Sequence, residues 1–208
     1  LISTLVNLIA LLFLVFGIKV FAATQKVVMA LGTLGGLVIL LLLTFASRET
    51  FIQAWNAMAT QYGSLDYNAF LAGTRSAMEA AGSTLPTTWN WFDTFGVMVA
   101  GSWLFAYSYC ITFIAGEVKR PDKTIILGNL FAILVPAFFM LWLAAVLYRA
   151  VGFEFLTASA WVEQNGGIDG YTLPWLPHYM GLAAVLTTNK LALILMAGSF
   201  ILFNLWYV

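Results

Sequence analysis

The sequence predicts an all-α integral membrane protein built around five transmembrane helices. Of the 208 residues, 62% are apolar and only 9% are charged, whereas about 25% of the residues of a soluble domain are charged. Five stretches are each apolar over about 20 residues, the length that crosses a bilayer as a helix; they cover residues 1–18, 27–46, 91–115, 125–148 and 191–208. The connections between them alternate between short and long, as consecutive crossings would produce.

The first two predicted spans flank a short charged connection at residues 19–26. In the second span, Gly32 and Gly36 lie four residues apart with Gly35 between them, and small residues at this spacing let helix backbones pack closely in a membrane. We expect this glycine face to serve helix packing, with a direct functional role as the alternative.

The remaining spans differ in character. Pro136 lies inside the fourth span and is expected to kink it. The chain begins at Leu1 and ends at Val208, both inside apolar runs. We therefore expect the first and last spans to be truncated and further helices of the same chain to be missing.

Charge predicts the orientation of the spans. The two short connections, residues 19–26 and 116–124, carry five of the nine Lys and Arg residues, and cytoplasmic loops are enriched in these residues. The short connections are therefore expected in the cytoplasm. The long connections, residues 47–90 and 149–190, are expected outside a cell membrane that the chain crosses several times.

The long outer connections are predicted to contain amphipathic helices. Apolar residues recur at helical spacing over residues 65–81 and again over residues 154–164. We expect several tryptophans, Trp55 among them, to anchor these connections at the outer interface, where indoles are enriched, with a gating role as the alternative. His178 follows two prolines in the second connection and is expected to be a solvated or capping residue.

Composition excludes several functions. Nine basic residues balance nine acidic ones, whereas a nucleic-acid partner needs a basic surface. One cysteine and one histidine provide neither a disulfide nor, by themselves, a metal site. No predicted span interior offers an acid, a base or a paired histidine, so an enzyme is not expected, and no cofactor or metal is predicted.

The third span is unusually polar at its centre. Six of the eleven residues from Ser102 to Thr112 are Ser, Thr, Tyr or Cys, and in hydrocarbon each polar side-chain group needs a partner. One interpretation is a helix that is broken locally, as in transporters whose half-helix ends bind substrate. The other is an intact helix packed on its neighbours, with Ser and Thr bonding to their own turn. The residues alone leave both open.

A sharper motif follows this span. The apolar stretch WLFAYSYCITFI, residues 103–114, leads directly into AGEVKRPDKTI, residues 115–125. Together they resemble the sixth helix of the amino acid–polyamine–organocation transporters, an aromatic-rich span that ends in Ala-Gly-Glu, a hydrophobic residue, Lys-Asn-Pro and a basic residue. Arg120 stands where Asn is usual. The stretch VNLIALLFLVFGIKVFAATQKV, residues 6–27, resembles the same family's fourth helix and the loop after it.

The resemblance implies that the five spans are helices four to eight of a larger inverted-repeat bundle, and that residues 1–208 are part of its transport domain. In that family the sixth helix is broken at the midplane, where substrate binds. The matching residues here imply a substrate site at Ala106, Tyr107, Ser108 and Tyr109, with Cys110 adjoining it. They also imply an outer aromatic gate at Trp103 or Phe105. The cytoplasmic motif residues are Gly116, Glu117, Lys119 and Pro121.

These expectations converge on secondary active transport of amino acids or related amines by alternating access. Some proton-coupled members of the family carry a lysine midway along the fifth helix, whereas the matching residues 30–33 include none, so that route of coupling is not supported and the coupling ion is left open. The expected partners are a small amino acid or amine, membrane lipid and the missing helices. The alternative is a non-transporting membrane sensor or accessory subunit of the same fold.

Overall fold

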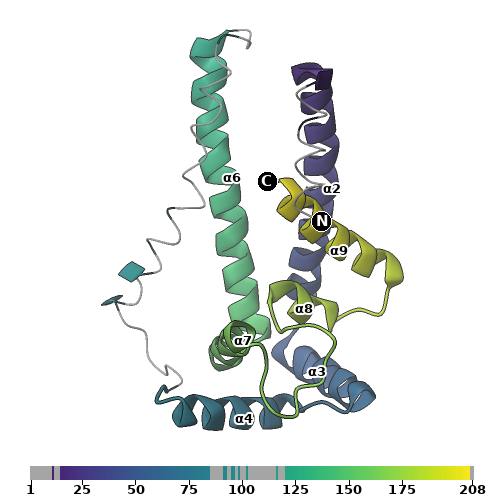
Figure 1. Ribbon diagram of the computed structural model, residues 1–208, viewed down its shortest axis with the longest axis vertical. Coiled ribbons are helices and arrows are strands. Elements are labelled where there is room, and N and C mark those ends of the chain that lie inside the picture. The colour runs from purple at the N-terminus through teal and green to yellow at the C-terminus, as the bar shows by residue number, and fades with distance from the viewer. Residues whose placement is uncertain are drawn as a thin grey trace. The chain divides into compact units, whose positions relative to one another are not determined.

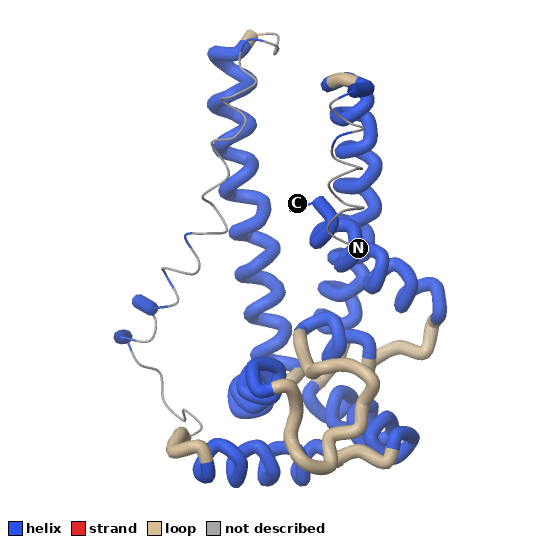
Figure 2. Tube along the Cα trace, viewed as in Figure 1, coloured by secondary structure: helices blue, strands red, loops and turns tan. Residues whose placement is uncertain are grey.

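The computed structural model describes residues 11, 15–84, 91–92, 95–96, 98, 102, 116 and 120–206. The chain divides into two units, residues 1–85 with 146–208 and residues 86–145. Throughout the part that is described, the chain forms helices joined by turns and loops, without strands (Figures 1 and 2). The predicted all-α class therefore holds for these residues.

Helix α2 runs from Ile18 to Phe45, and its stretch Ala22–Phe45 is long and apolar enough to cross a membrane. Gly17 precedes the helix with φ 81°, a conformation that glycine adopts without a steric penalty. The predicted loop at residues 19–26 is wrong, because these residues form the first turns of α2. They contain no Gly or Pro, and their Ala, Lys and Gln residues favour helix, so the break lies at Gly17.

Helix α6, Pro121–Ala150, is the second element long and apolar enough to cross a membrane. It contains the predicted span 125–148 and continues through Pro136. Pro121 is the first residue of α6. Proline is favoured at this position of a helix, because the N–H that it lacks would have no helical partner there. Most of the large apolar side chains of α6 are exposed, among them Phe131 and Phe138.

Two membrane-length helices are thus seen among the described residues, where the sequence predicts five spans. The predicted spans 1–18 and 91–115 lie mostly outside the described residues. The predicted span 191–208 begins as α9, Lys190–Trp206, an apolar helix of 17 residues. Helix α9 packs along α2 (Figure 1).

The first long connection contains two helices, α3, Arg48–Tyr62, and α4, Tyr67–Ala80. Each begins with a side-chain cap, since the Ser47 hydroxyl accepts a hydrogen bond from the Thr50 N–H and Asp66 accepts one from the Ala69 N–H. Such caps satisfy backbone donors that have no partner inside the helix. The predicted helix at residues 65–81 is confirmed as α4.

The second long connection contains α7, Phe153–Asn165, and a short helix α8, Tyr179–Ala184. The prediction of a helix at residues 154–164 is confirmed. A long loop joins α7 to α8 (Figure 2). His178 caps α8, because its Nδ1 accepts a hydrogen bond from the Met180 N–H at 3.2 Å, and its ring stacks on Phe200 of α9. The expected capping role of His178 is therefore confirmed.

The loop helices share an aromatic core. Phe51, Trp55, Phe70 and Phe155 are completely buried, and the Trp55 and Phe155 rings meet edge to face with centroids 4.9 Å apart. The Trp55 indole N–H donates to the Leu65 carbonyl at 3.1 Å. The prediction that Trp55 anchors the chain at the membrane interface is wrong, because its ring fills a protein core and its polar atom is satisfied there.

Candidate functional site

The predicted substrate and gate residues lie outside the described part of the chain: Trp103, Phe105, Ala106, Tyr107, Ser108, Tyr109 and Cys110. Glu117 and Lys119 of the predicted cytoplasmic motif also lie outside it. Two motif residues are described: Gly116 is exposed, and Pro121 begins α6.

The end of the motif is a tight helix start. Arg120 has φ 56°, which is uncommon for a residue other than glycine. Its carbonyl accepts hydrogen bonds from the N–H groups of Lys123 and Thr124 at 3.2 and 3.1 Å. The motif therefore leads directly into α6, so that the sharpest sequence signal adjoins the longest apolar helix described.

The glycine face of α2 makes a close helix crossing with α9. A Cβ atom placed on Gly35 would lie 2.3 Å from the Leu195 carbonyl oxygen and 2.4 Å from the Ser199 Cβ, so only glycine fits. Ser199 is buried, and its hydroxyl donates to the Met196 carbonyl at 2.8 Å. The predicted packing role is confirmed at Gly35. At Gly36, by contrast, an added Cβ atom would have no described neighbour within 4 Å.

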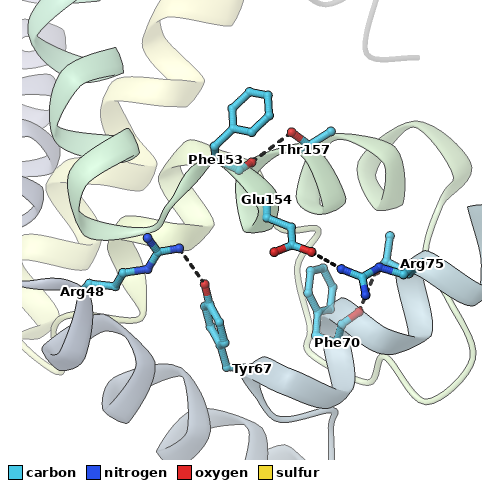
Figure 3. A network of polar contacts seen from close by, with 8 residues as sticks. Arg48, Tyr67, Phe70, Arg75, Phe153, Glu154 and Thr157 are labelled. Atoms are coloured by element: carbon cyan, nitrogen blue, oxygen red, sulfur yellow. Dashed lines mark hydrogen bonds and ion pairs between the residues drawn. The ribbon is translucent and has the colours of Figure 1, made fainter. Parts of the chain in front are cut away.

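A polar junction joins the C-terminal end of α6 to the loop helices (Figure 3). The Tyr67 hydroxyl donates to the Val151 carbonyl at 3.2 Å and accepts from the Arg48 guanidinium at 3.4 Å. Gly152, which follows Val151 in the chain, has φ 93°. A Cβ atom added to Gly152 would lie 1.8 Å from Arg48 Nη2. The guanidinium thus occupies the space that a side chain at residue 152 would need.

Two further contacts hold this region together. The Tyr67 ring stacks on Phe155 with centroids 4.6 Å apart, and Arg75 of α4 forms an ion pair with Glu154 of α7 (Figure 3). The ion pair is exposed and contributes little, since such pairs are worth about 0–1 kcal/mol. The buried aromatic contacts therefore dominate the packing of α4 on α7.

The C-terminal end of α2 is capped by a side chain from α6. Arg149 donates through Nη2 to the carbonyl groups of Leu43, Thr44 and Ala46, at 3.3 Å for the first and last of these. The last carbonyls of a helix lack helical partners, and a cation there also interacts favourably with the helix dipole.

A shallow, open hollow of about 470 Å³ lies on the loop between α7 and α8 and is lined by residues 166–169, 171 and 173–176. The Tyr171 hydroxyl donates to the Trp175 carbonyl at 2.6 Å. Burial raises the pKa of Tyr171, and burial followed by the charge of Glu163 raises the pKa of Tyr179. Both phenols are therefore neutral near pH 7; of the two, only Tyr171 lines the hollow, together with Asp169.

Comparison with protein-family models, with curated proteins and with solved structures found no match. Identification of this chain consequently depends on its own residues. In the described part of the chain, no three His, Cys, Asp or Glu residues are grouped so that they could hold a metal ion.

Several features of this region went unpredicted although the sequence carries signals for some of them. Helix α3 was missed, yet Phe51, Trp55 and Ala59 recur every four residues and form its buried face. The Arg149 cap and the contact of Arg48 with Gly152 join residues about one hundred positions apart. No local pattern could have indicated them.

Proposed function

We propose that this chain forms part of a secondary transporter that moves amino acids or related amines across a cell membrane by alternating access. The observation that carries the proposal is the order of three features along the chain. An apolar segment at residues 102–112 contains several polar and aromatic side chains and is followed by the AGEVKRPDKTI motif. The motif leads into α6, a helix of 30 mostly apolar residues.

The described helices support a membrane location. Helix α2 is 28 residues long, or about 42 Å at 1.5 Å per residue, while the hydrocarbon core is about 30 Å thick. The N-terminal turns with Lys19 and Lys26 can therefore extend beyond the hydrocarbon while residues 27–45, about 28 Å long at the same rise, cross most of it. The exposed apolar surface of α6 suits lipid or the further helices that the proposal requires.

Substrate would bind at the centre of the third span. Free backbone groups near residues 106–109 would meet the ammonium and carboxylate groups of the substrate, as broken helices in transporters do. Trp103 or Phe105 would close the site from outside, and Cys110 would adjoin it. No covalent chemistry is required, so the chain would not be an enzyme.

Uptake into proteoliposomes tests the proposal. Full-length protein is reconstituted and offered a panel of labelled amino acids and amines, with imposed proton gradients, imposed sodium gradients, or neither. Protein-free liposomes and liposomes loaded with unlabelled substrate, for counterflow, are the controls. We expect saturable uptake of at least one neutral amino acid, because the interiors of the five predicted spans contain no Asp, Glu, Lys or Arg to pair with a charged side chain.

Absence of both uptake and counterflow across the panel, with folded and correctly oriented protein, would contradict transport. Binding of an amino acid without any flux would favour the sensor or accessory subunit of the same fold.

A further inference from the structure

An apolar groove lies at the C-terminal end of α2. It has a volume of about 370 Å³ and is lined by Val38, Leu41, Leu42, Phe45, Thr50 and Leu186. Pockets for small molecules span about 300–1,000 Å³, so the groove suits one slender apolar group better than a bulky one. Phe45 and Leu41 at its edge are 84% and 46% exposed.

The groove lies where the apolar helix α2 ends and the more polar segment containing α3 begins. Helix α2 ends at Phe45, and the capping residue Ser47 begins α3 immediately afterwards. If Ala22–Phe45 crosses the membrane as proposed, the groove lies at the boundary between acyl chains and headgroups. An exposed apolar groove at this depth is in contact with lipid.

A cation stands beside the groove. The exposed Arg149 guanidinium donates to the carbonyl of Ala46, which also lines the groove. The other charged residues of this helix end are Arg48, which contacts Tyr67, and Glu49 in the first turn of α3. The two arginines outnumber the one acid, and arginine suits phosphate because its planar donors match phosphate oxygens.

We propose that this groove binds one acyl chain of a membrane phospholipid, with the lipid phosphate against Arg149. The apolar lining supplies a surface for methylene groups, and the guanidinium at its edge supplies the charge complementarity. The proposal rests on α2 crossing a membrane but does not need the chain to transport anything.

Lipid binding by delipidated full-length protein in detergent tests this inference. The probe is dioleoylphosphatidylglycerol, titrated onto the protein and counted by native mass spectrometry. The Leu41→Trp variant fills the groove with an indole. The matched control is Leu34→Trp, which changes a 51% exposed leucine two helical turns earlier on the same face, outside the groove.

We expect wild type and Leu34→Trp to retain one lipid with the same affinity. Leu41→Trp should weaken its binding about tenfold, or about 1.4 kcal/mol. Equal binding by the two tryptophan variants would overturn the site, because a groove filled by protein or open to any annular lipid would not distinguish them.

The phosphate contact is tested without altering the Arg149 cap. Dioleoylglycerol, which has the same chains and no phosphate, should bind wild type more weakly than the phospholipid, by about fivefold to tenfold or about 1–1.4 kcal/mol. Equal affinity for the two probes would overturn the role of Arg149. Because uptake and lipid retention are separate measurements, failure of transport with lipid bound as expected would contradict the proposed function alone.

Discussion

Replacing Gly152 with alanine is the sharpest test of how the loop helices are fixed to the C-terminal end of α6. Gly152 has φ 93° and ψ 148°, a region essentially confined to glycine, and an L residue there costs about 1–3 kcal/mol. The added Cβ would also lie 1.8 Å from Arg48 Nη2. The guanidinium must therefore move and lose its hydrogen bond to Tyr67, which costs about a further 0.5–1.5 kcal/mol. We expect a total loss of about 1.5–4.5 kcal/mol in the free energy of unfolding.

Chemical denaturation of full-length protein in detergent, followed by tryptophan fluorescence, measures this loss because Trp55 lies in the core of the loop helices. The control is Gly36→Ala, where the Cβ meets no described atom within 4 Å; its expected effect is within about 0.5 kcal/mol, or slightly stabilising, because alanine favours helix. In an Arg48→Ala background, Gly152→Ala should cost less, by about 0.5–1.5 kcal/mol. An unchanged unfolding curve for Gly152→Ala, or an equal cost in both backgrounds, would refute the reasoning.

Three further predictions concern packing, topology and substrate. Gly35→Ala should destabilise the protein by about 1–3 kcal/mol through overpacking, measured by the same denaturation; a curve like that of Gly36→Ala would contradict the α2–α9 crossing. In a Cys110→Ala background, cysteines at Ser83 and Asp122 should react with an impermeant maleimide from opposite sides of the membrane; labelling from one side would end the proposed topology. Ser108→Phe should weaken binding of the cognate amino acid about tenfold or more, or about 1.4 kcal/mol, while size-exclusion elution stays unchanged; unaltered affinity would move the site off the third span.

The helical loops could be predicted because local chemistry determines them. Helix α4 lies within one or two residues of its predicted bounds, where Asp66 caps one end, and α7 ends at Gly166 in the left-handed conformation. Caps and apolar spacing lie close together in sequence, so they are readable without tertiary information. The same holds for His178, whose capping position follows Pro177 directly.

Two predictions were wrong for a different reason. Charged residues suggested a loop at residues 19–26, but lysine favours helix about as well as other straight-chain residues, and Lys19 and Lys26 lie within α2. Trp55 resembled an interfacial anchor because indoles favour that depth, but its burial depends on Phe155, one hundred residues away. The local sequence shows neither how far a helix extends beyond its apolar stretch nor which distant residue packs against an aromatic ring.

The midplane site remains a prediction from sequence alone, since residues 103–115 lie outside the described part of the chain. Its polar side chains must be satisfied in either interpretation. What distinguishes an intact helix from a broken one is which backbone groups are free, and this depends on contacts with other helices. For that reason Ser108→Phe is chosen to place a larger side chain in the proposed substrate site, and its readout is substrate affinity rather than helix stability.

The C-terminal ends of α2 and α6 depend on the same folded loops. The last carbonyls of α2 are satisfied by Arg149, and the carbonyl of Val151 just beyond α6 is satisfied by Tyr67 of α4. A buried backbone group without a partner costs about 1–3 kcal/mol, so these two side chains help to determine where the helices end. Tyr67 is in turn held by its stacking on Phe155. The aromatic core of the loops therefore helps to determine where α6 ends, and a substitution in that core should be felt at the C-terminal end of α6 as well as in the loops.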